Sequence, residues 1–562
     1  TSRDRLVFDV GHQSYPHKML TGRREQMSTI RQLGGIAGFP KPSESVHDAF
    51  IAGHASNSVA VAVGMARARD MLGEDYRVLA LIGDGALTGG LAYEGLSTAG
   101  QSRGQLLVIL NDNGMSITKN VGGVAEHLAR QRLKPQYLTF KKYYRKVMNA
   151  TWFGRKIYRV THRLKKAVKE SLLPSSLFEN MGFTYLGPVN GHDLRELTEI
   201  LRYARDLKEP VLLHVRTIKG KDFTPAEENP DAYHGVSPFD PETGEPLKQG
   251  RASFSSVFGR EVARLAREDP RVCAVTAAMQ TGTGLDYFAL QFPDRFFDVG
   301  IAEGCAVSMA AGMAKQGTVP VVAVYSTFLQ RAYDMLLHDV ALDRLHVVLA
   351  VDRAGLVGED GETHQGVFDV SYLNSVPGMR VYAPANFAEL KAMLEEAVLR
   401  WDGPAAVRYP RGGEGEYRED SGRAPAAVLR LGSHITLVSY GVEINDVLQA
   451  ARLLEERGVE AEVVKLNIIT PLDAAPVLDS VRRTGALLVA EDSVSAGSVG
   501  ERLACALEQA GISARVALCS SGDTFTPHGS VGELKRLLEL DGAGLAQRAM
   551  EVLRFDKTAA GC

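Results

Sequence analysis

The strongest constraint on the fold is an alternation of two patterns from end to end of the 562-residue chain: short runs rich in Val, Ile and Leu, and stretches of helical periodicity. The apolar runs predict buried strands at residues 77–82, 106–110, 272–276, 319–325, 347–351, 435–439 and 487–490. Helical patterns such as 444–457 and 499–510 lie between them. Strands alternating with helices predict an α/β protein whose largely parallel sheets are flanked by helices.

Two segments without periodicity divide the chain. Residues 224–250 and 414–425 are rich in Pro, Gly and charge, which is typical of linkers. We therefore expect three α/β domains, at residues 1–249, 250–425 and 426–562, each of a size common for one domain. The chain starts with Thr1 and not with Met, so we expect that it begins partway into the first domain.

Composition narrows the functional classes. Lys and Arg total 64 against 67 Asp and Glu, a net charge of −3, which gives no support to a nucleic-acid or membrane role for the whole protein. No apolar run approaches the ~20 residues of a membrane helix. The five cysteines include no Cys-x-x-Cys pair, which favours neither a zinc site nor a disulfide framework and fits a reducing cytoplasm.

One stretch departs from this composition. Residues 130–169 contain no Asp or Glu but many Lys, Arg and aromatic residues. Such a stretch could bind nucleic acid. We favour a solvated, mobile insertion at about residues 125–175, because the whole chain is slightly acidic and no nucleic-acid fold signature accompanies the patch.

Polar residues follow two of the predicted strands. Gly83-Asp84-Gly85 comes directly after strand 77–82, and Asn111-Asp112-Asn113 follows strand 106–110. Open α/β sheets bind ligands at the carboxyl ends of their strands. One carboxylate, one amide oxygen and a nearby carbonyl are ligands that Mg²⁺ accepts beside phosphate and water. The glycines that flank Asp84 let the backbone approach a diphosphate, and the amino end of the predicted helix 91–99 adds positive potential. Two unrelated turns are the alternative, but the pairing favours a diphosphate–magnesium site.

This pair of motifs resembles the thiamine-diphosphate fingerprint, which begins with Gly-Asp-Gly and ends in Asn-x-Asn. By that resemblance Asp84, Asn113 and the Met115 carbonyl hold Mg²⁺. Such enzymes also need a carboxylate against the aminopyrimidine ring, and Glu303 stands in the family's Gly-Ile-Ala-Glu context. Phe328 would stack on the pyrimidine. Without the resemblance, Glu303 would be an ordinary helix-start charge and Phe328 an ordinary core aromatic.

Four further motifs resemble those of 1-deoxy-D-xylulose-5-phosphate synthases, a transketolase-like family. They are Asp9-Val10-Gly11-His12-Gln13-Ser14-Tyr15-Pro16-His17-Lys18, Gly53-His54-Ala55-Ser56-Asn57-Ser58, Asp360-Gly361-Glu362-Thr363-His364-Gln365-Gly366 and Arg408-Tyr409-Pro410-Arg411-Gly412. The resemblance covers essentially the whole chain and implies diphosphate, pyrimidine and carboxyl-terminal domains in that order. Two features depart from the family. Its Gly-His-x-Gly-Ser histidine upstream of Asp9 is not in this chain, and Gly220-Lys221-Asp222-Phe223 replaces Gly-Lys-Gly-Tyr.

The resemblance implies an activity: pyruvate is decarboxylated and joined to D-glyceraldehyde 3-phosphate, with thiamine diphosphate and Mg²⁺ as cofactors. The product, 1-deoxy-D-xylulose 5-phosphate, feeds isoprenoid, thiamine and pyridoxal synthesis. It also implies a cytoplasmic homodimer without nucleic-acid or membrane partners, and the small-residue helix at 306–314 is a candidate for packing at the dimer interface.

The resemblance also implies roles for individual residues. The catalytic residues are Glu303, His12, His364 and Asp360, with imidazoles suited to moving protons near neutrality. The substrate-binding residues are Tyr325, Arg353, Arg411 and Arg331, since guanidinium groups match phosphate. The cofactor-binding residues are His12, Gly53, His54, Ala55, Gly83, Asp84, Gly85, Ala86, Asn113, Lys219, Glu303 and Phe328, and His234 faces the cofactor with Lys219.

Three rival functions stay open. A transketolase would share the cofactor and domain order but would not decarboxylate, and the 12–18 and 360–366 motifs favour the synthase. The dehydrogenase component of a 2-oxo-acid complex would need a lipoyl partner. A catalytically silent scaffold would have no reason to retain Asp84, Asn113, Glu303, His364 and Arg411 together.

Overall fold

The computed structural model describes residues 3–102, 104–115, 177–235, 238–247 and 252–554. The chain forms two compact units, one of residues 1–24 and 39–248 and one of residues 25–38 and 249–562. No helix within the described ranges is long and apolar enough to cross a membrane. The basic insertion expected at about 125–175 lies outside the described residues.

The first unit contains a five-stranded sheet in the order β1-β2-β3-β5-β4, with every neighbouring pair parallel. Its strands are β1 Arg5–Phe8, β2 Val78–Gly83, β3 Leu107–Asp112, β4 Thr184–Asn190 and β5 Val211–Arg216. Helix α2, Ser58–Leu72, packs on β1 and β2, and α3, Gly90–Gln101, packs on α2. Helix α8, Leu194–Arg205, packs on β4. This sheet confirms the predicted strands 77–82 and 106–110 within one or two residues.

The second unit begins with a seven-stranded sheet in the order β15-β10-β11-β9-β8-β6-β7, parallel except for the β10–β15 pair. Its strands are β6 Val272–Thr276, β7 Phe296–Asp298, β8 Val319–Tyr325, β9 Val348–Asp352, β10 Arg380–Tyr382, β11 Ala405–Arg408 and β15 Ile468–Thr470. Strands β8 and β9 are buried along their whole length, as their continuous apolar sequences predict for a central parallel strand.

Helices cover both faces of this sheet. Helices α10, Phe254–Glu268, and α16, Phe387–Glu395, pack together in one core, and α12, Glu303–Lys315, packs against β8 in another. The proposal that α12 packs at a dimer interface stays a prediction, and Ala306, Ala310 and Ala311 do not face outward. Their side chains are buried in the core of their own chain, because a small-residue face lets a helix approach its own sheet closely.

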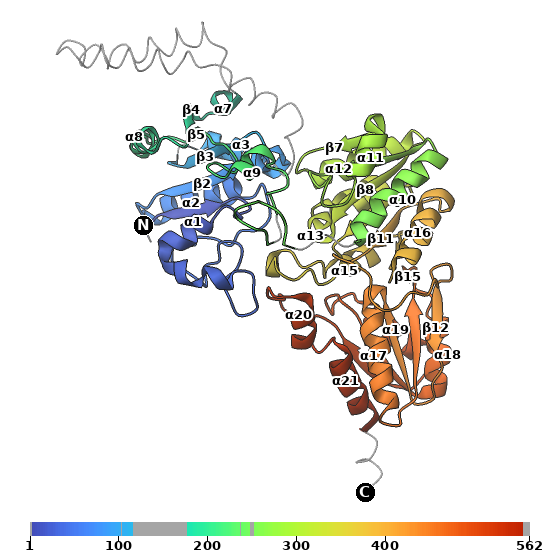
Figure 1. Ribbon diagram of the computed structural model, residues 1–562. Coiled ribbons are helices and arrows are strands. Elements are labelled where there is room, and N and C mark those ends of the chain that lie inside the picture. The colour runs from blue at the N-terminus through green and yellow to red at the C-terminus, as the bar shows by residue number, and fades with distance from the viewer. Residues whose placement is uncertain (1–2, 103, 116–176, 236–237, 248–251, 555–562) are drawn as a thin grey trace, which may run out of the picture. The chain divides into compact units, whose positions relative to one another are not determined.

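The third sheet has the order β12-β14-β13-β16-β17 and is parallel except for the β12–β14 pair. Its strands are β12 Ala426–Arg430, β13 Ile435–Tyr440, β14 Ala461–Leu466, β16 Ala486–Ala490 and β17 Arg515–Cys519. Helices α17, Ile444–Glu455, and α21, Gly542–Arg554, pack together on one face, and α18, Ala475–Thr484, and α19, Val499–Gln509, lie on the other (Figure 1). Three mostly parallel, helix-flanked sheets confirm the α/β class. The three-domain boundaries stay a prediction, and β15 joins the second sheet from beyond residue 426.

Shorter helices connect these elements. They are α1 Tyr15–Lys18, α7 Leu177–Asn180, α9 Thr224–Glu228, α11 Asp286–Gln291, α13 Ser326–Leu329, α14 Tyr333–Met335, α15 Asp369–Asn374 and α20 Val531–Leu537. The expected linker at 414–425 has no helix or strand.

The expected linker at 224–250 has local structure in its described part, and its role as a domain boundary stays a prediction. It contains α9 and a bridge between Phe239 and Pro246. Phe223, Tyr233 and Phe239 pack ring against ring at centroid distances of 5.3 to 5.8 Å, and Tyr233 donates a hydrogen bond to the Gly244 carbonyl at 2.6 Å. Three aromatic rings supply a small core where the sequence shows no periodicity.

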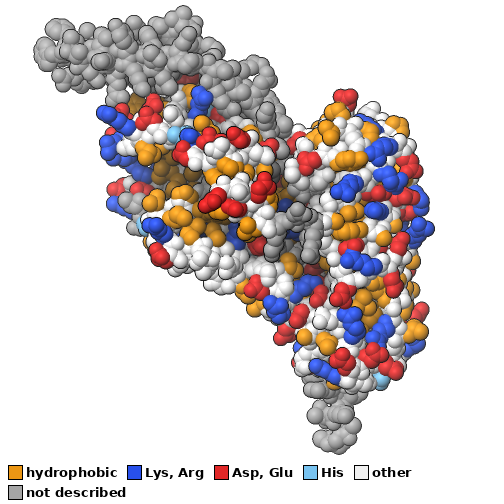
Figure 2. Space-filling model, in the orientation of Figure 1, with side chains coloured by type: hydrophobic (Ala, Val, Ile, Leu, Met, Phe, Trp, Pro, Cys, Tyr) orange, Lys and Arg blue, Asp and Glu red, His pale blue; other side chains and the backbone are white. Residues whose placement is uncertain are grey.

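Charged side chains on the face shown in Figure 2 are mixed in sign, with Lys and Arg lying among Asp and Glu. Arg264, for example, pairs with Glu261, Glu268 and Glu395. This mixture on the visible face agrees with the near-zero net charge and shows no basic tract for nucleic acid there.

Candidate active site

The carboxyl edge of the first sheet gathers the site residues predicted for the first unit. His12 follows β1, Asp84 follows β2, Asn113 follows β3 and Lys219 follows β5. Parallel strands point their carboxyl ends to one edge, so four segments distant in sequence meet there. This is the position at which open α/β sheets bind phosphorylated ligands.

A buried carboxylate fixes the 53–58 loop at this edge. Asp9, at the end of β1 and 4% exposed, accepts hydrogen bonds from the backbone N–H of Ser56 at 2.7 Å and of Ser58 at 3.0 Å. The Ser56 hydroxyl donates to the Ala86 carbonyl at 2.7 Å. Two side chains therefore tie the loop of Gly53, His54 and Ala55 to β1 and to the turn after β2. The motif at 9–18 contains Asp9 but did not indicate this role.

The donors and acceptors around Asp84 fit a magnesium ion. Asp84 is 1% exposed, and the Gly114 N–H donates to its Oδ2 at 2.8 Å. The Asn113 Oδ1 accepts from the Met115 N–H at 3.0 Å, which turns the amide oxygen toward the same short loop. The described residues hold no cluster of three or more His, Cys, Asp or Glu side chains suited to a metal. One carboxylate with an amide and a carbonyl oxygen suits Mg²⁺, whose other ligands are phosphate and water.

A buried hydrogen-bond chain supports this loop from behind. His214 and Asp112 are fully or almost fully buried, and Nε2 of His214 lies 2.8 Å from Oδ2 of Asp112. The Tyr185 hydroxyl lies 2.7 Å from Nδ1 of His214. Burial raises the pKa of Tyr185, so its hydroxyl keeps its proton in this chain of hydrogen bonds. Asp112 Oδ1 accepts from the Gly114 N–H at 3.1 Å, which connects the chain to the loop that follows β3.

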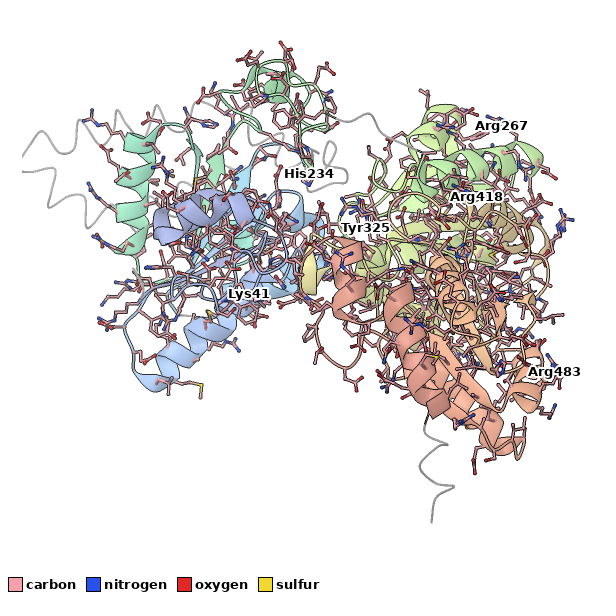
Figure 3. The ribbon with its side chains drawn as sticks, turned by 60° about the horizontal axis from the view of Figure 1, so that its bottom comes forward. Lys41, His234, Arg267, Tyr325, Arg418 and Arg483 are labelled. Atoms are coloured by element: carbon pink, nitrogen blue, oxygen red, sulfur yellow. The ribbon has the colours of Figure 1, made fainter. Side chains whose placement is uncertain are left out.

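Lys219, His234 and His12 lie together at this edge. Nζ of Lys219 lies 3.1 Å from Nδ1 of His234, and the rings of His12 and His234 have centroids 5.0 Å apart. Burial, with the charges of His12 and Lys219, lowers the pKa of His234 to about 3, so this ring is neutral and accepts a hydrogen bond from the ammonium group. Figure 3 shows His234 on the loop that follows α9. These groups can donate hydrogen bonds to a diphosphate.

In the second unit, Glu303 is the first residue of α12 and is 3% exposed. Its Oε2 lies 3.5 Å from Nη1 of Arg331. Burial raises the pKa of Glu303, and the guanidinium of Arg331 opposes that shift. Burial in such surroundings favours the protonated form of the carboxyl group, which can donate a hydrogen bond.

An aromatic and cationic stack adjoins β8. Tyr325, labelled in Figure 3, ends that strand. Its ring stacks on Phe328 with centroids 5.8 Å apart. Phe328 in turn meets the His364 ring edge-on at 5.5 Å. Cζ of Arg353 lies 3.8 Å from the centroid of Tyr325, a close cation–π contact. The stack brings four predicted site residues together.

A cavity of about 510 Å³ opens beside this stack, within the second unit. Its polar lining includes Ser253, Ser255, Arg260, Asp286, Arg353 and Arg411. Asp352, fully buried at the end of β9, lies near this wall, and burial raises its pKa to about 7 against the opposing effects of Arg353, Ser255 and Arg411. Two predicted arginines thus face a space large enough for a small phosphorylated molecule.

Asp360 forms an ion pair with Arg31, which lies in the 25–38 segment of the same unit. Burial alone would raise the pKa of Asp360, but His364, Arg31, Arg411 and Arg353 hold it below its usual value. Asp360 is therefore ionised at the centre of a cationic cluster. Arg31 was missed from the sequence because it lies 329 residues from Asp360 and outside every motif.

Comparisons with known families match almost the whole chain. A model described as 1-deoxy-D-xylulose-5-phosphate synthase matches residues 1–217. Models described as the transketolase pyrimidine binding domain and the transketolase C-terminal domain match residues 251–414 and 424–545.

Individual relatives align over most of their length. The chain is 49% identical to 1-deoxy-D-xylulose-5-phosphate synthase of Symbiobacterium thermophilum, over 98% of this chain and 86% of that protein. It is 48% identical to the enzyme of the same name from Pelotomaculum thermopropionicum, over 94% and 84%. Among solved structures, transketolase from Leishmania mexicana aligns at 17% identity and a TM-score of 0.47, over 99% of this chain and 90% of that one.

Proposed function

The chain belongs to the 1-deoxy-D-xylulose-5-phosphate synthase family, and from that premise we propose that it joins pyruvate to D-glyceraldehyde 3-phosphate with release of CO₂. The product is 1-deoxy-D-xylulose 5-phosphate, a precursor of isoprenoids, thiamine and pyridoxal, and the enzyme is a transferase. The observation that carries this function is the match to synthases along nearly the whole chain.

Thiamine diphosphate is the cofactor of this reaction, and when bound it supplies the carbon nucleophile and electron sink for decarboxylation. We assign Mg²⁺ to Asp84, Asn113 and the Met115 carbonyl, which the hard oxygen character of this donor set supports. The remaining residues at this edge bind the diphosphate and ring through backbone and side-chain groups. They are His12, Gly53, His54, Ala55, Gly83, Gly85, Ala86 and Lys219.

Glu303 hydrogen-bonds the pyrimidine ring, and burial raises the pKa of this carboxyl, which favours its sharing a proton with a ring nitrogen. Arg331 keeps that carboxyl oriented at 3.5 Å and also faces substrate. Phe328, which stacks on Tyr325 and meets His364 edge-on, supplies an apolar surface for the ring. The burial of Glu303 supports this assignment, since its proton is shielded from water.

The acceptor's phosphate binds to Arg353 and Arg411, and Tyr325 closes the wall beside them. His364 and His12 move protons at the developing alkoxide oxygen, and Asp360 orients His364. The Thr363 hydroxyl lies 2.7 Å from Nδ1 of His364 and helps to hold the ring in place. We further propose a homodimer and a cytoplasmic location, the first from the family and the second from a sequence whose five cysteines include no Cys-x-x-Cys pair.

Decarboxylation with phosphorylated and unphosphorylated glyceraldehyde tests this function. The wild-type protein releases CO₂ from pyruvate, with preference for the phosphorylated acceptor. In Arg411→Ala, the loss of a charge-assisted contact of roughly 1.5–3 kcal/mol raises KM for glyceraldehyde 3-phosphate about tenfold or more. KM for pyruvate changes less, because pyruvate carries no phosphate. An undiminished preference would exclude Arg411 from the phosphate site. A loss confined to pyruvate would place it on the donor carboxylate.

A further inference from the structure

The residues that follow β9 form a closed loop that carries two of the proposed catalytic side chains. Gly355 and Gly366 exchange two backbone hydrogen bonds at 2.8 Å and close the neck of the loop. The ten residues between them, 356–365, include Asp360 and His364. The loop has no strand and only one short helical turn, Gly361–Thr363. Its own backbone therefore fixes His364 less firmly than a sheet would.

Gln365 ties this loop together from the inside. Its side chain is 3% exposed, and its Oε1 accepts from the N–H of Val357 at 2.8 Å and of Gly358 at 3.3 Å. Its Nε2 donates to the Gly358 carbonyl at 3.4 Å and to the Pro527 carbonyl at 3.1 Å. The amide thus uses both its acceptor sites and both its donor hydrogens. Pro527 lies 162 residues away, beyond the third sheet, so one side chain connects the loop to the carboxyl-terminal region.

The partner segment is residues 526–529, and it lies against the 356–365 loop at backbone distance. A Cβ built on Gly358, where φ is +90°, would lie 2.9 Å from the Gly529 carbonyl oxygen. A Cβ built on Gly361, where φ is +70°, would lie 2.9 Å from Cβ of His528. Neither position has room for a side chain, and both have a conformation that favours glycine. The two loops therefore fit together in one register.

His528 extends the contact to a third segment. Its side chain is 8% exposed, and its Nε2 donates to the Gly35 carbonyl at 3.1 Å. Gly35 belongs to the 25–38 segment, which also carries Arg31, the ion-pair partner of Asp360. Leu356, Val367, Val494 and Leu534 form a small buried apolar cluster that joins the ends of the 356–365 loop to the carboxyl-terminal region. Two segments distant in sequence, 25–38 and 526–529, are therefore held against one loop.

We propose that Gln365 and His528 are positioning residues for the reaction. Gln365 clamps the 356–365 loop to residues 526–529, and His528 clamps residues 526–529 to the 25–38 segment. Together they set the places of His364 and Asp360, neither of which they need to touch. The carboxyl-terminal region thereby acquires a direct part in ordering the loop. The inference rests on the proposed role of His364, and misplacement of a reacting group by about 1 Å can cost on the order of a hundredfold in rate.

Gln365→Glu separates the clamp from simple packing. The glutamate keeps the size of the side chain and its two accepted hydrogen bonds but cannot donate to Pro527 when ionised. We expect kcat to fall on the order of tenfold or more, while KM for both substrates changes little. Hydrogen exchange of the full chain, followed by mass spectrometry without substrates, should show faster exchange in peptides covering 356–365. Gln547→Glu, at an exposed position on α21, is the matched control and should change neither quantity.

A second test compares His528→Gln with His528→Ala. It can be carried out even if Gln365→Glu folds poorly. The glutamine amide can donate to the Gly35 carbonyl as Nε2 does, whereas alanine cannot. We expect His528→Gln to retain most of the wild-type kcat and His528→Ala to lose it. Equal kcat in both variants, or faster loop exchange with unchanged kcat, would overturn the proposal. Unchanged loop exchange in Gln365→Glu would overturn it too. Hydrogen exchange is measured without turnover. It therefore tests whether Gln365 and His528 order the loop even if the wild-type protein makes no product.

Discussion

At the scale of single residues, Asp84 concentrates negative charge where water cannot reach it. A carboxylate that is 1% exposed needs a cation or several donors to be stable, and Gly114 supplies one N–H. We expect Asp84→Ala to abolish the rise in Tm that Mg²⁺ with thiamine diphosphate produces in the wild-type protein. Differential scanning calorimetry with and without Mg²⁺ measures this. An unchanged magnesium-dependent rise in the variant would show that the ion binds elsewhere.

Asp352 predicts a dependence of stability on pH. Burial raises its pKa from 3.8 in the unfolded chain to about 7 in the folded protein. Below pH 3.8 both states are protonated, and as the pH rises toward 7 the unfolded state ionises first, so stability is lost across that window. For every pH unit that separates the two pKa values, the free energy of unfolding falls by about 1.4 kcal/mol.

Asp352→Asn removes this titration. Denaturant unfolding at pH 5 and pH 8 should show a smaller loss with pH in the variant than in the wild-type protein. Asp343→Asn, at a position 58% exposed, serves as the control and should follow the wild-type profile. A variant profile parallel to the wild type would contradict the raised pKa.

The sequence singled out residues through motifs, but it did not show which residues support them, even where a supporting residue such as Gln365 lies within a motif. Asp84, Asn113 and Arg353 lie beside predicted strands, and Glu303 and Arg411 lie within family motifs. Arg31, Gln365 and His214 act through partners 329, 162 and 102 residues away, a separation that no local pattern encodes. Asp222 is an intermediate case. It has φ of +70° where the family has glycine, so the departure seen in the sequence marks a strained position.

At the scale of elements, central strands were predictable because they are buried on both faces and read as continuous apolar runs. The predicted strands 272–276 and 319–325 match β6 and β8 to the residue. Strands β7, β10 and β15 have three residues each, too few for a pattern to separate β10 and β15 from turns. The antiparallel β12 and β15 lie at sheet edges, and their direction depends on chain connections that hydrophobicity does not report.

A buried ion pair joins a strand of the third sheet to a helix that covers the second sheet. Nζ of Lys465, on β14, lies 2.9 Å from Oε2 of Glu389, on α16, and both side chains are fully buried. Burial lowers the pKa of Lys465 and the charge of Glu389 opposes it. Lys465→Met leaves a buried carboxylate without its cation, which we expect to cost about 3–5 kcal/mol of unfolding free energy.

Lys315→Met is the matched control for this prediction. Its pair with Asp343 is 60% and 58% exposed, and exposed pairs contribute about 0–1 kcal/mol. Denaturant titration of both variants measures the difference. Equal losses of unfolding free energy in the two variants would mean that burial does not determine how much the Lys465–Glu389 pair stabilises the protein.

At the scale of the whole molecule, the family pairs diphosphate and pyrimidine domains in homodimers. We expect static light scattering to give twice the 60.9 kDa of one chain when thiamine diphosphate and Mg²⁺ are present. Ala306, Ala310 and Ala311 of α12 are already buried within their own chain, so we expect the interface to use other side chains. A mass of one chain under these conditions would contradict the dimer.

The identity of the product tests the central claim most directly. Pyruvate labelled with ¹³C at C2 and C3 is incubated with D-glyceraldehyde 3-phosphate, thiamine diphosphate and Mg²⁺, and the product is read by ¹³C NMR and mass spectrometry. The account predicts one CO₂ released for each 1-deoxy-D-xylulose 5-phosphate formed, with the label in its methyl and ketone carbons. Pyruvate left unconsumed, together with ketol transfer to the same aldehyde in a parallel incubation with a ketose phosphate, would identify a transketolase and contradict the synthase assignment.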